Sequence, residues 1–248
     1  MKFYSKIVLG SMRMEPQRQG LKDWLNLLSY AHALGIDRIH CSDEYYTFPF
    51  FLTLMDETRL YLPQANFKFT VKLAEPHFGQ TDFEPKRLLR RIDAYRKVLQ
   101  TDQLDCVQWM WRGNLDDSAS RLRGFCESTN RISDVVEHLK LKSIIKSFHC
   151  FPYTVEFAER ALDNPMVDGL CIYRNPMETE CDILLERASA VRKSILVIRP
   201  FKAGEALAKS GYSELIKFSA RLPVVDGIVL SCSSIRHLEE CVQAANSC

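Results

Sequence analysis

Short apolar runs alternate with amphipathic segments along the whole 248-residue chain. A continuous apolar run of this length is typical of a buried strand in a parallel sheet. The runs are KIVLGS (6–11), RIHCS (38–42), FKFTVKL (67–73), LDCVQWMW (104–111), KSIIKSF (142–148), GLCIYR (169–174), SILVIRP (194–200) and GIVLSCS (227–233). Their ends lie roughly 25–40 residues apart, which is the length of one strand followed by one helix.

The segments between the runs carry apolar residues at helical spacing. The stripes are Leu21, Trp24, Leu25 and Leu28; Leu88, Ile92 and Tyr95; and Ile235, Leu238, Val242 and Ala245. About eight strand-and-helix units in roughly 250 residues predict an α/β fold, the (β/α)8 TIM barrel. Because the composition shows no break, we expect a single domain over residues 1–248.

The competing fold is an open doubly wound sheet. Such a sheet would need a glycine-rich turn after its first strand to bind a dinucleotide. The segment GSMRME carries only one glycine there, and the chain has 10 glycines in all. The barrel is therefore the better prediction.

Composition narrows the partners that we expect. The formal net charge is +2, so the sequence shows no basic or acidic excess for nucleic acid or for an anionic membrane. No window approaches about 18 uncharged apolar residues, and the start MKFYSKIVLG has no signal-peptide pattern. We expect a cytoplasmic protein that acts on a small molecule; the oligomeric state stays open.

The 9 cysteines are odd in number and include no C-x-x-C pair. This pattern disfavours a zinc ribbon, an iron–sulfur cluster and a disulfide framework, and several of these cysteines lie within apolar runs. We expect reduced thiols in the core and no metal site. His40 and His149 at one barrel mouth could bind a metal ion, but the H-x-H pattern of barrel hydrolases is absent.

The stretch RIHCSDEYY, residues 38–46, concentrates titratable side chains at the end of the second predicted strand. A core strand does not need them for packing, since it prefers Val, Ile and Leu. In a TIM barrel the catalytic residues lie at the C-terminal ends of the strands. We therefore expect the chemistry of this protein at that strand end.

Several short motifs follow one another in a fixed order: LGSMRM (9–14), AHALGIDRIHCSDEYY, FTVKL, LDCVQWMW, RPFKAG and GIVLSCSSIRHLEECVQAA. In order and spacing they resemble the aldo-keto reductases, a family of NADP-dependent barrel oxidoreductases. The family's segments read LGxGTMR, A-x-x-x-G-I-x-x-x-D-T-A-x-x-Y, TK, D-x-x-x-x-H, PL-x-x-G and a closing phosphate-binding loop and helix. The resemblance covers nearly the whole chain and implies hydride transfer between NADP(H) and a carbonyl or alcohol.

The resemblance also implies a catalytic set. The family uses a tyrosine general acid, a lysine that lowers its pKa, an aspartate paired to the lysine, and a histidine that orients the carbonyl. Tyr45 matches the tyrosine and Lys72 the lysine, whereas His40 replaces the aspartate and Met110 replaces the histidine. A tyrosine pKa near about 10 needs a nearby cation before the phenol donates readily. Asp43 is the expected carboxylate partner of Lys72, with His40 as the substitute.

The substrate side of the predicted site departs from the family. Met110 cannot donate a hydrogen bond, so the orienting role is lost or has moved to Trp111, Arg112 or His149. The run Trp109, Met110 and Trp111 predicts an aromatic pocket floor where the family is polar. We expect substrate contacts from Trp109, Met110, Trp111 and Arg112.

The resemblance assigns cofactor contacts to several strand ends. They are Gly10, Ser11 and Met12 after the first strand, Ser147 and His149 at the fifth, Tyr173 at the sixth, Lys202 and Gly204 at the seventh, and Ser231, Ser233, Ser234 and Arg236 at the eighth. Tyr173 would stack on the nicotinamide. Hydroxyls, helix N–H groups and an arginine suit a phosphate monoester, so Arg236 favours NADP over NAD. Ser233 and Ser234 could equally cap the last helix.

Two other functions stay open at this point. Loss of two of the four expected catalytic residues is compatible with a non-catalytic, regulatory barrel that keeps the fold. A lyase or isomerase using Tyr45 or His40 as acid–base, without redox change, is the other alternative.

Overall fold

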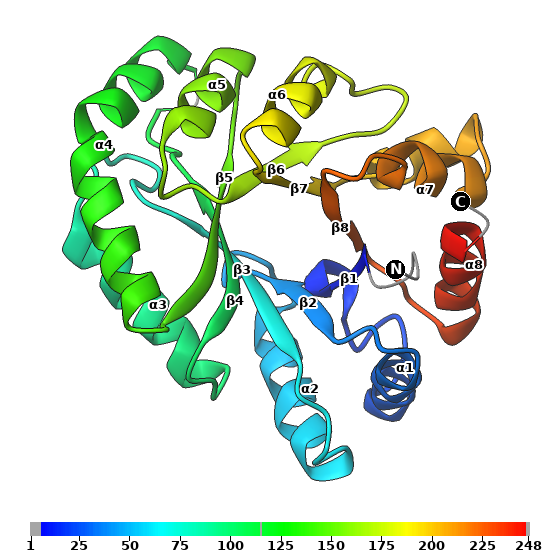
Figure 1. Ribbon diagram of the computed structural model, residues 1–248. Helices are drawn as coiled ribbons and strands as arrows, with labels where there is room; N and C mark the ends of the chain where they lie inside the picture. The colour runs from blue at the N-terminus through cyan, green and yellow to red at the C-terminus, as the bar shows by residue number, and fades with distance from the viewer. Residues whose placement is uncertain (1–5, 115, 247–248) are drawn as a thin grey trace. The chain divides into compact units, whose positions relative to one another are not determined.

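The computed structural model describes residues 6–114 and 116–246 of the chain. The strand order is that of a closed barrel in which β1 to β8 follow one another in sequence, and the strand pairs with a described register are parallel. The strands, labelled in Figure 1, are β1 (Ile7–Gly10), β2 (Arg38–Cys41), β3 (Lys68–Ala74), β4 (Leu104–Met110), β5 (Ile145–Phe151), β6 (Gly169–Tyr173), β7 (Ser194–Ile198) and β8 (Val225–Leu230). The predicted (β/α)8 fold is confirmed.

A helix follows each strand, as the amphipathic segments predict. The α-helices are α1 (Leu21–Ala33), α2 (Phe48–Tyr61), α3 (Pro85–Val98), α4 (Ser118–Leu141), α5 (Val155–Asp163), α6 (Leu185–Ala190), α7 (Tyr212–Ala220) and α8 (Ile235–Asn246). Short 3-10 helices are η2 (Ser11–Arg13), η3 (Asp182–Leu184) and η4 (Lys202–Ala208).

The fifth strand departs most from its predicted position, by three residues at each end, and the eighth is displaced by two and three residues in the other direction. The apolar run 142–148 predicts a strand that ends before His149, but β5 spans Ile145–Phe151. The ladder to β4 continues through the pairs His149 with Gln108 and Phe151 with Met110. These last residues of β5 are buried, so the cooperative sheet extends the strand beyond the run of aliphatic side chains.

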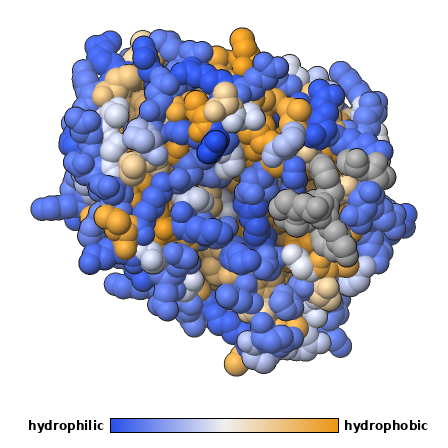
Figure 2. All heavy atoms as spheres, viewed as in Figure 1, coloured by the Kyte–Doolittle hydropathy of each residue, from blue (hydrophilic) through white to orange (hydrophobic). Residues whose placement is uncertain are grey.

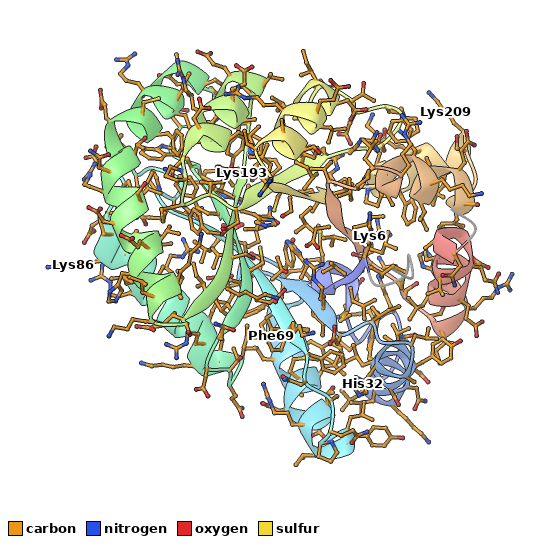
Figure 3. All side chains as sticks on the ribbon, in the orientation of Figure 1. Lys6, His32, Phe69, Lys86, Lys193 and Lys209 are labelled. Atoms are coloured by element: carbon orange, nitrogen blue, oxygen red, sulfur yellow. The ribbon has the colours of Figure 1, made fainter. Side chains whose placement is uncertain are left out.

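The chain separates into two compact units. The first unit comprises residues 1–69, 173–179 and 196–248, as far as these are described. In it β1 pairs with β2 on one side and with β8 on the other, and α7 packs on α8. The ammonium of Lys6 donates to the carbonyls of Ala220 and Leu222, which fastens the start of β1 to the segment before β8 (Figure 3). Burial lowers the pKa of Lys6.

The second unit comprises residues 70–172 and 180–195. Its strands β3, β4, β5 and β6 pair in sequence order, with α4 and α5 against β5 (Figure 1). Figure 3 shows Lys86 extending outward from α3, whereas Lys193 lies among the elements of the unit. The ammonium of Lys193 donates to the carbonyl of Asn164 just after α5, and burial lowers the pKa of Lys193.

The surface is largely hydrophilic. Figure 2 shows polar side chains over most of the face that it draws, with smaller apolar areas between them. Apolar residues such as Tyr46, Leu60, Leu141 and Ile183 are exposed from different elements. In the described part of the chain no helix is long and apolar enough to cross a membrane.

Candidate active site

The ends of β1, β2 and β8 meet closely in the first unit. Gly10, the last residue of β1, pairs with His40 of β2. A Cβ atom at Gly10 would lie 2.7 Å from Oγ of Ser231, just after β8, and 3.1 Å from Cγ1 of Val229. A larger residue here would force the side chain of Ser231 to move, so glycine allows the end of β1 to lie close against the start of the β8–α8 loop.

Tyr45 lies in the tight turn between β2 and α2. Its N–H donates to the carbonyl of Ser42 at 3.1 Å, and its carbonyl accepts from the N–H of Phe48 at 2.9 Å. The ring centroids of Tyr45 and His40 are 6.2 Å apart with a tilt of 41°. The turn thus holds the predicted acid beside the histidine that replaces the family's aspartate.

The Tyr45 turn is tied to the end of β1 by two side chains that the sequence did not single out. The buried hydroxyl of Thr47 donates to the carbonyl of Ser11 at 3.1 Å. The phenol of Tyr46 donates to the carboxylate of Glu15 at 2.6 Å, and this hydrogen bond raises the pKa of Tyr46 and lowers that of Glu15. Two adjacent tyrosines therefore have different surroundings, since Tyr46 is 69% exposed and Tyr45 is half-buried.

Ser11 supplies an unsatisfied polar atom at the end of β1. Its Oγ is buried and makes no hydrogen bond to any residue that the structure describes. A buried hydroxyl without a partner is costly, and such atoms commonly mark the position of a ligand or a water molecule. Met12, the next residue, is 51% exposed. Asp43, the predicted carboxylate partner of Lys72, is exposed in the turn after β2.

Lys72 belongs to the second unit, where two polar residues lie beside it in register on the neighbouring strands. Lys72 of β3 pairs with Gln108 of β4, and Gln108 pairs with His149 of β5. Trp109 packs toward Phe125 of α4, so Gln108, which points the opposite way, faces the barrel interior. Gln108 is 1% exposed, and the sequence reading missed it. A glutamine within an apolar strand was the available signal.

The sequence predicted His149 at the end of the fifth strand, whereas the structure places it within β5, which continues to Phe151. Its Nε2 is 3.1 Å from Oγ of Ser194, the first residue of β7. A Cβ at Gly169, the first residue of β6, would lie 3.0 Å from the same nitrogen. The imidazole therefore points toward strand beginnings, away from the C-terminal ends where barrel chemistry takes place. Ser147, also within β5, donates its hydroxyl to the carbonyl of Asp105 at 2.8 Å.

The two tryptophans of β4 and its end pack against helices, which corrects the predicted aromatic pocket floor. Trp109 is fully buried, contacts Phe125 and Phe148, and donates its indole N–H to the carbonyl of Glu75 at 2.8 Å. Trp111 covers Gly124 of α4, where a Cβ would lie 2.6 Å from its ring. The physical reason is alternation along the strand, which turns Trp109 to the helix side and Met110 to the interior.

Met110, the last residue of β4, contacts Arg112 two residues later. Met110 is 6% exposed, and its sulfur is 3.9 Å from Nη2 of Arg112. The guanidinium of Arg112 also stacks over the ring of Phe78 at 4.5 Å. A cationic donor thus contacts the thioether, although Met110 itself has no hydrogen to donate.

Tyr173 is the last residue of β6 and belongs to the first unit, and a guanidinium lies over its ring. The guanidinium of Arg199 lies 4.6 Å from the ring centroid, and the ring is 37% exposed. Arg199 also lies 3.4 Å from the carboxylate of Glu178. The arrangement leaves an accessible aromatic ring at a strand end, which is what stacking on a flat ligand requires.

The turn after β7 is strained. Lys202, Ala203 and Gly204 have φ angles of 45°, 57° and 105°, and the left-handed region disfavours side chains. A non-glycine residue held there costs about 1–3 kcal/mol, and such strain clusters at ligand-binding turns. The ammonium of Lys202, whose side chain is half-buried, lies 3.1 Å from the carboxylate of the exposed Glu205.

At the start of α8 the structure distinguishes Ser233 from Ser234, either of which could cap the helix according to the sequence. The hydroxyl of Ser234 accepts the N–H of His237 at 3.1 Å, which makes Ser234 the N-cap of the helix. Ser231 and Ser233 lie half-buried in the loop before it. Arg236 is exposed and pairs with Glu240 at 3.1 Å one turn later. Hydroxyls, a helix N-terminus and a guanidinium therefore occupy one short segment.

Two cysteines and a histidine lie just behind this segment and influence each other's protonation. Hydrogen bonds from Cys232 and then His237 lower the pKa of Cys241 to about 6, against the opposing effect of burial. The same thiol–thiol contact raises the pKa of Cys232, and the contact with Cys241 raises that of His237. These contacts favour the thiolate form on Cys241 over that on Cys232.

Comparison with known proteins gives a fold and no closer assignment. No family model matches the chain, and no curated protein matches it. A solved structure from Pseudomonas aeruginosa, provisionally named an aldo-keto reductase, shares 20% identity and a TM-score of 0.75, covering 98% of this chain and 89% of its own. An aldo-keto reductase from Bacillus halodurans in its holo form shares 14% identity with a TM-score of 0.72, over 96% of this chain and 86% of its own.

A third similar structure is that of an aldo/keto reductase from Klebsiella pneumoniae in complex with NADP and acetate. It shares 16% identity and a TM-score of 0.71, covering 97% of this chain and 86% of its own. At these identities the likeness shows a common fold over nearly the whole chain, the fold of the aldo-keto reductase barrels.

Proposed function

We propose that this chain is an NADP(H)-dependent oxidoreductase of the aldo-keto reductase type, acting on a carbonyl or alcohol group of a small molecule. The observation that carries the proposal is the likeness over 96–98% of the chain to barrels of that family. Two of the similar structures, both from Klebsiella pneumoniae, are complexes with NADP or NADPH. The motif order in the sequence, from Gly10 to Arg236, supports the same assignment.

Residues of the first unit fit such a cofactor. The orphaned hydroxyl of Ser11, the close approach of β1 to Ser231 and the exposed ring of Tyr173 lie at strand ends. The strained turn at Lys202 and the loop with Ser233 and Arg236 supply donors and cations for phosphate. Ser147 and His149 make their hydrogen bonds within β5 and toward β7, so the argument does not depend on them.

In this proposal, bound NADPH supplies the hydride, and the residues of the chain manage the proton. Tyr45 donates its phenolic proton to the carbonyl oxygen as negative charge develops there. Lys72 stabilises the resulting phenolate, since a nearby cation lowers a tyrosine pKa. His40, whose ring lies beside Tyr45, modulates the acid from the position of the family's aspartate, and Asp43 is the proposed carboxylate partner of Lys72.

The residue that would orient the substrate is the position at which this chain departs most from the aldo-keto reductases. Met110 cannot donate a hydrogen bond, and Arg112, whose guanidinium touches its sulfur, is the donor that we propose instead. Trp109 and Trp111 shape this region from the helix side and do not enter the mechanism. The same substitution of Met110 favours the second candidate, a non-catalytic barrel that retains the cofactor site as a regulatory subunit. The cytoplasm is the location that we propose for either.

Two measurements test the proposal. Fluorescence titration should detect NADPH binding below millimolar concentration, and its absence would end the cofactor assignment. With a screened carbonyl substrate, Tyr45→Phe should lower kcat by about 10²–10⁴, the usual contribution of a positioned acid. Tyr46→Phe is the matched control, because it removes a hydroxyl from the neighbouring ring that bonds to Glu15. Tight NADPH binding without turnover of any carbonyl would favour the regulatory barrel.

A further inference from the structure

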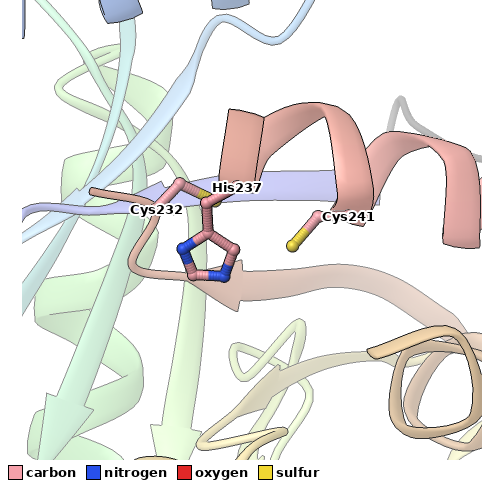
Figure 4. Close-up of side chains that lie close together, drawn as sticks. All are labelled: Cys232, His237 and Cys241. Carbon is pink, nitrogen blue, oxygen red and sulfur yellow. The ribbon is translucent and has the colours of Figure 1, made fainter. Parts of the chain in front are cut away.

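Cys232, His237 and Cys241 form a compact cluster in the first unit that the proposed reductase chemistry does not use. Their three potential ligand atoms, two sulfurs and one imidazole nitrogen, all lie within 4.8 Å of one another. Figure 4 shows the imidazole and the two sulfurs together where the loop after β8 meets α8. Cys232 is 2% exposed, Cys241 is fully buried and His237 is half-buried.

The backbone holds the three side chains in place from two directions. His237 and Cys241 are four residues apart in α8, so they project from one face of the helix. Cys232 follows β8 by two residues, and β8 is fixed by its pairing with β1. Ser234 caps α8 at the N–H of His237, which sets where the helix begins relative to the loop.

The imidazole also contains an unsatisfied polar atom. Nε2 of His237 is buried and makes no hydrogen bond to the described residues. The rings of Tyr212, at 5.0 Å between centroids, and Phe201, at 6.5 Å, shield the histidine. A polar ring nitrogen buried beside aromatic rings without a partner is an expensive arrangement unless something binds it.

We propose that Cys232, His237 and Cys241 bind a borderline-soft divalent metal ion, with Zn²⁺ the best match. Two thiolates and one imidazole are ligands that Zn²⁺ prefers, and three protein ligands leave a fourth position for water or another small donor. Zn–S and Zn–N bonds of about 2.3 and 2.0–2.1 Å in tetrahedral geometry separate the ligand atoms by about 3.5–3.8 Å. Side-chain rotations that draw the cluster together by about 1 Å would therefore complete the site.

Binding needs no redox partner. The thiols give up their protons to solvent as Zn–S bonds form, so affinity should increase with pH. The ion would join the end of β8 to the first two turns of α8 and stabilise the folded chain by mass action. The site goes beyond the proposed reductase function and can be measured without NADPH or substrate. The competing role for the two sulfurs is a reversible Cys232–Cys241 disulfide.

The test uses the full chain, reduced and freed of metal under anaerobic conditions. Zn²⁺ titration against a chromophoric chelator should give one tightly bound ion per chain. Co²⁺ in its place should produce a thiolate-to-cobalt charge-transfer band in the near ultraviolet together with the visible bands of four-coordinate cobalt. Addition of Zn²⁺ should also raise the melting temperature of the unmodified chain.

Variants assign the metal to this cluster. Cys232→Ala, His237→Gln and Cys241→Ala should each weaken Zn²⁺ binding by more than about 100-fold, beyond the effect of losing an outer-shell partner. Cys171→Ala, a buried strand cysteine outside the cluster, is the matched control and should bind as the unmodified chain does. Circular dichroism and melting of each metal-free variant check folding.

Three results would overturn the proposal. One is the absence of tight Zn²⁺ binding by the reduced chain. Another is a cobalt complex without the charge-transfer band, or one that survives in the cluster variants, since the ion would then bind elsewhere. The third is a disulfide between Cys232 and Cys241, found by peptide mass analysis, in a protein that binds no metal after reduction.

Discussion

The two adjacent tyrosines of the β2–α2 turn have different side-chain surroundings. Tyr46 is exposed and bonded to Glu15, whereas Tyr45 is half-buried beside His40. The sequence predicted Tyr45 by its position in a motif, and the structure gives that position an environment distinct from its neighbour's. Removing the hydroxyl of Tyr45 can therefore be compared with removing that of Tyr46, a neighbouring tyrosine with different contacts.

In the proposed mechanism Lys72 and Tyr45 contribute to the same proton-transfer step. In that mechanism Lys72 is the cation that stabilises the phenolate, so Lys72→Met should lower kcat by about as much as Tyr45→Phe. The double variant should be no slower than the slower single variant, because each change alone already removes the same proton-transfer step. Steady-state kinetics of the four proteins measures this. Additive losses would mean that Lys72 contributes to something other than the acidity of Tyr45.

Elements, in contrast to single residues, were largely readable from the sequence. The runs predicted all eight strands to within three residues at each end, because strands buried on both faces are nearly all apolar. The β5 boundary was missed because ladder pairing, which a single sequence does not reveal, extends the strand through His149. Trp109 was misplaced for the related reason that a run of apolar residues hides which face each one occupies.

The same limit explains the residues that sequence reasoning missed. Gln108 becomes notable only when register sets it beside Lys72. Cys232, His237 and Cys241 have no C-x-x-C spacing, since two of them use the turn of a helix and the third a strand end. A search for compact sequence motifs cannot find such a set, whereas the packing of α8 on the end of β8 brings it together.

The start of α8 yields a prediction that separates capping from phosphate binding. Ser234→Ala removes the acceptor for the His237 N–H, so the free energy of unfolding should fall by about 0.5–2 kcal/mol. Ser233→Ala should leave stability nearly unchanged and weaken NADPH binding, if its hydroxyl contacts phosphate. Urea denaturation and NADPH titration of both variants provide the comparison. Equal losses of stability would show that the two hydroxyls share the capping role.

At the scale of the whole molecule, the closed barrel should protect most of its thiols. The eight cysteines that the structure describes are free thiols. Six are buried: Cys41, Cys106, Cys150, Cys171, Cys232 and Cys241. Burial raises the pKa of Cys41 and of Cys150, so these two thiols are both inaccessible and protonated. Only Cys126 is exposed, and Cys181 is half-buried.

An aromatic disulfide reagent such as dithiobis(nitrobenzoate), which reacts with accessible thiolates, should therefore distinguish exposed from buried cysteines in the folded protein. In a Cys248→Ser background, used because residue 248 lies outside the described range, the native protein at pH 8 should show one fast-reacting thiol, which Cys126→Ser removes. Burial raises the pKa of Cys181 to about 11, so the thiolate that reacts is scarce at pH 8. Its rate should rise about tenfold per pH unit up to that value. The six buried thiols should react only after denaturation, and their rapid reaction in the native protein would mean that the sheet opens far more readily than a closed parallel barrel should.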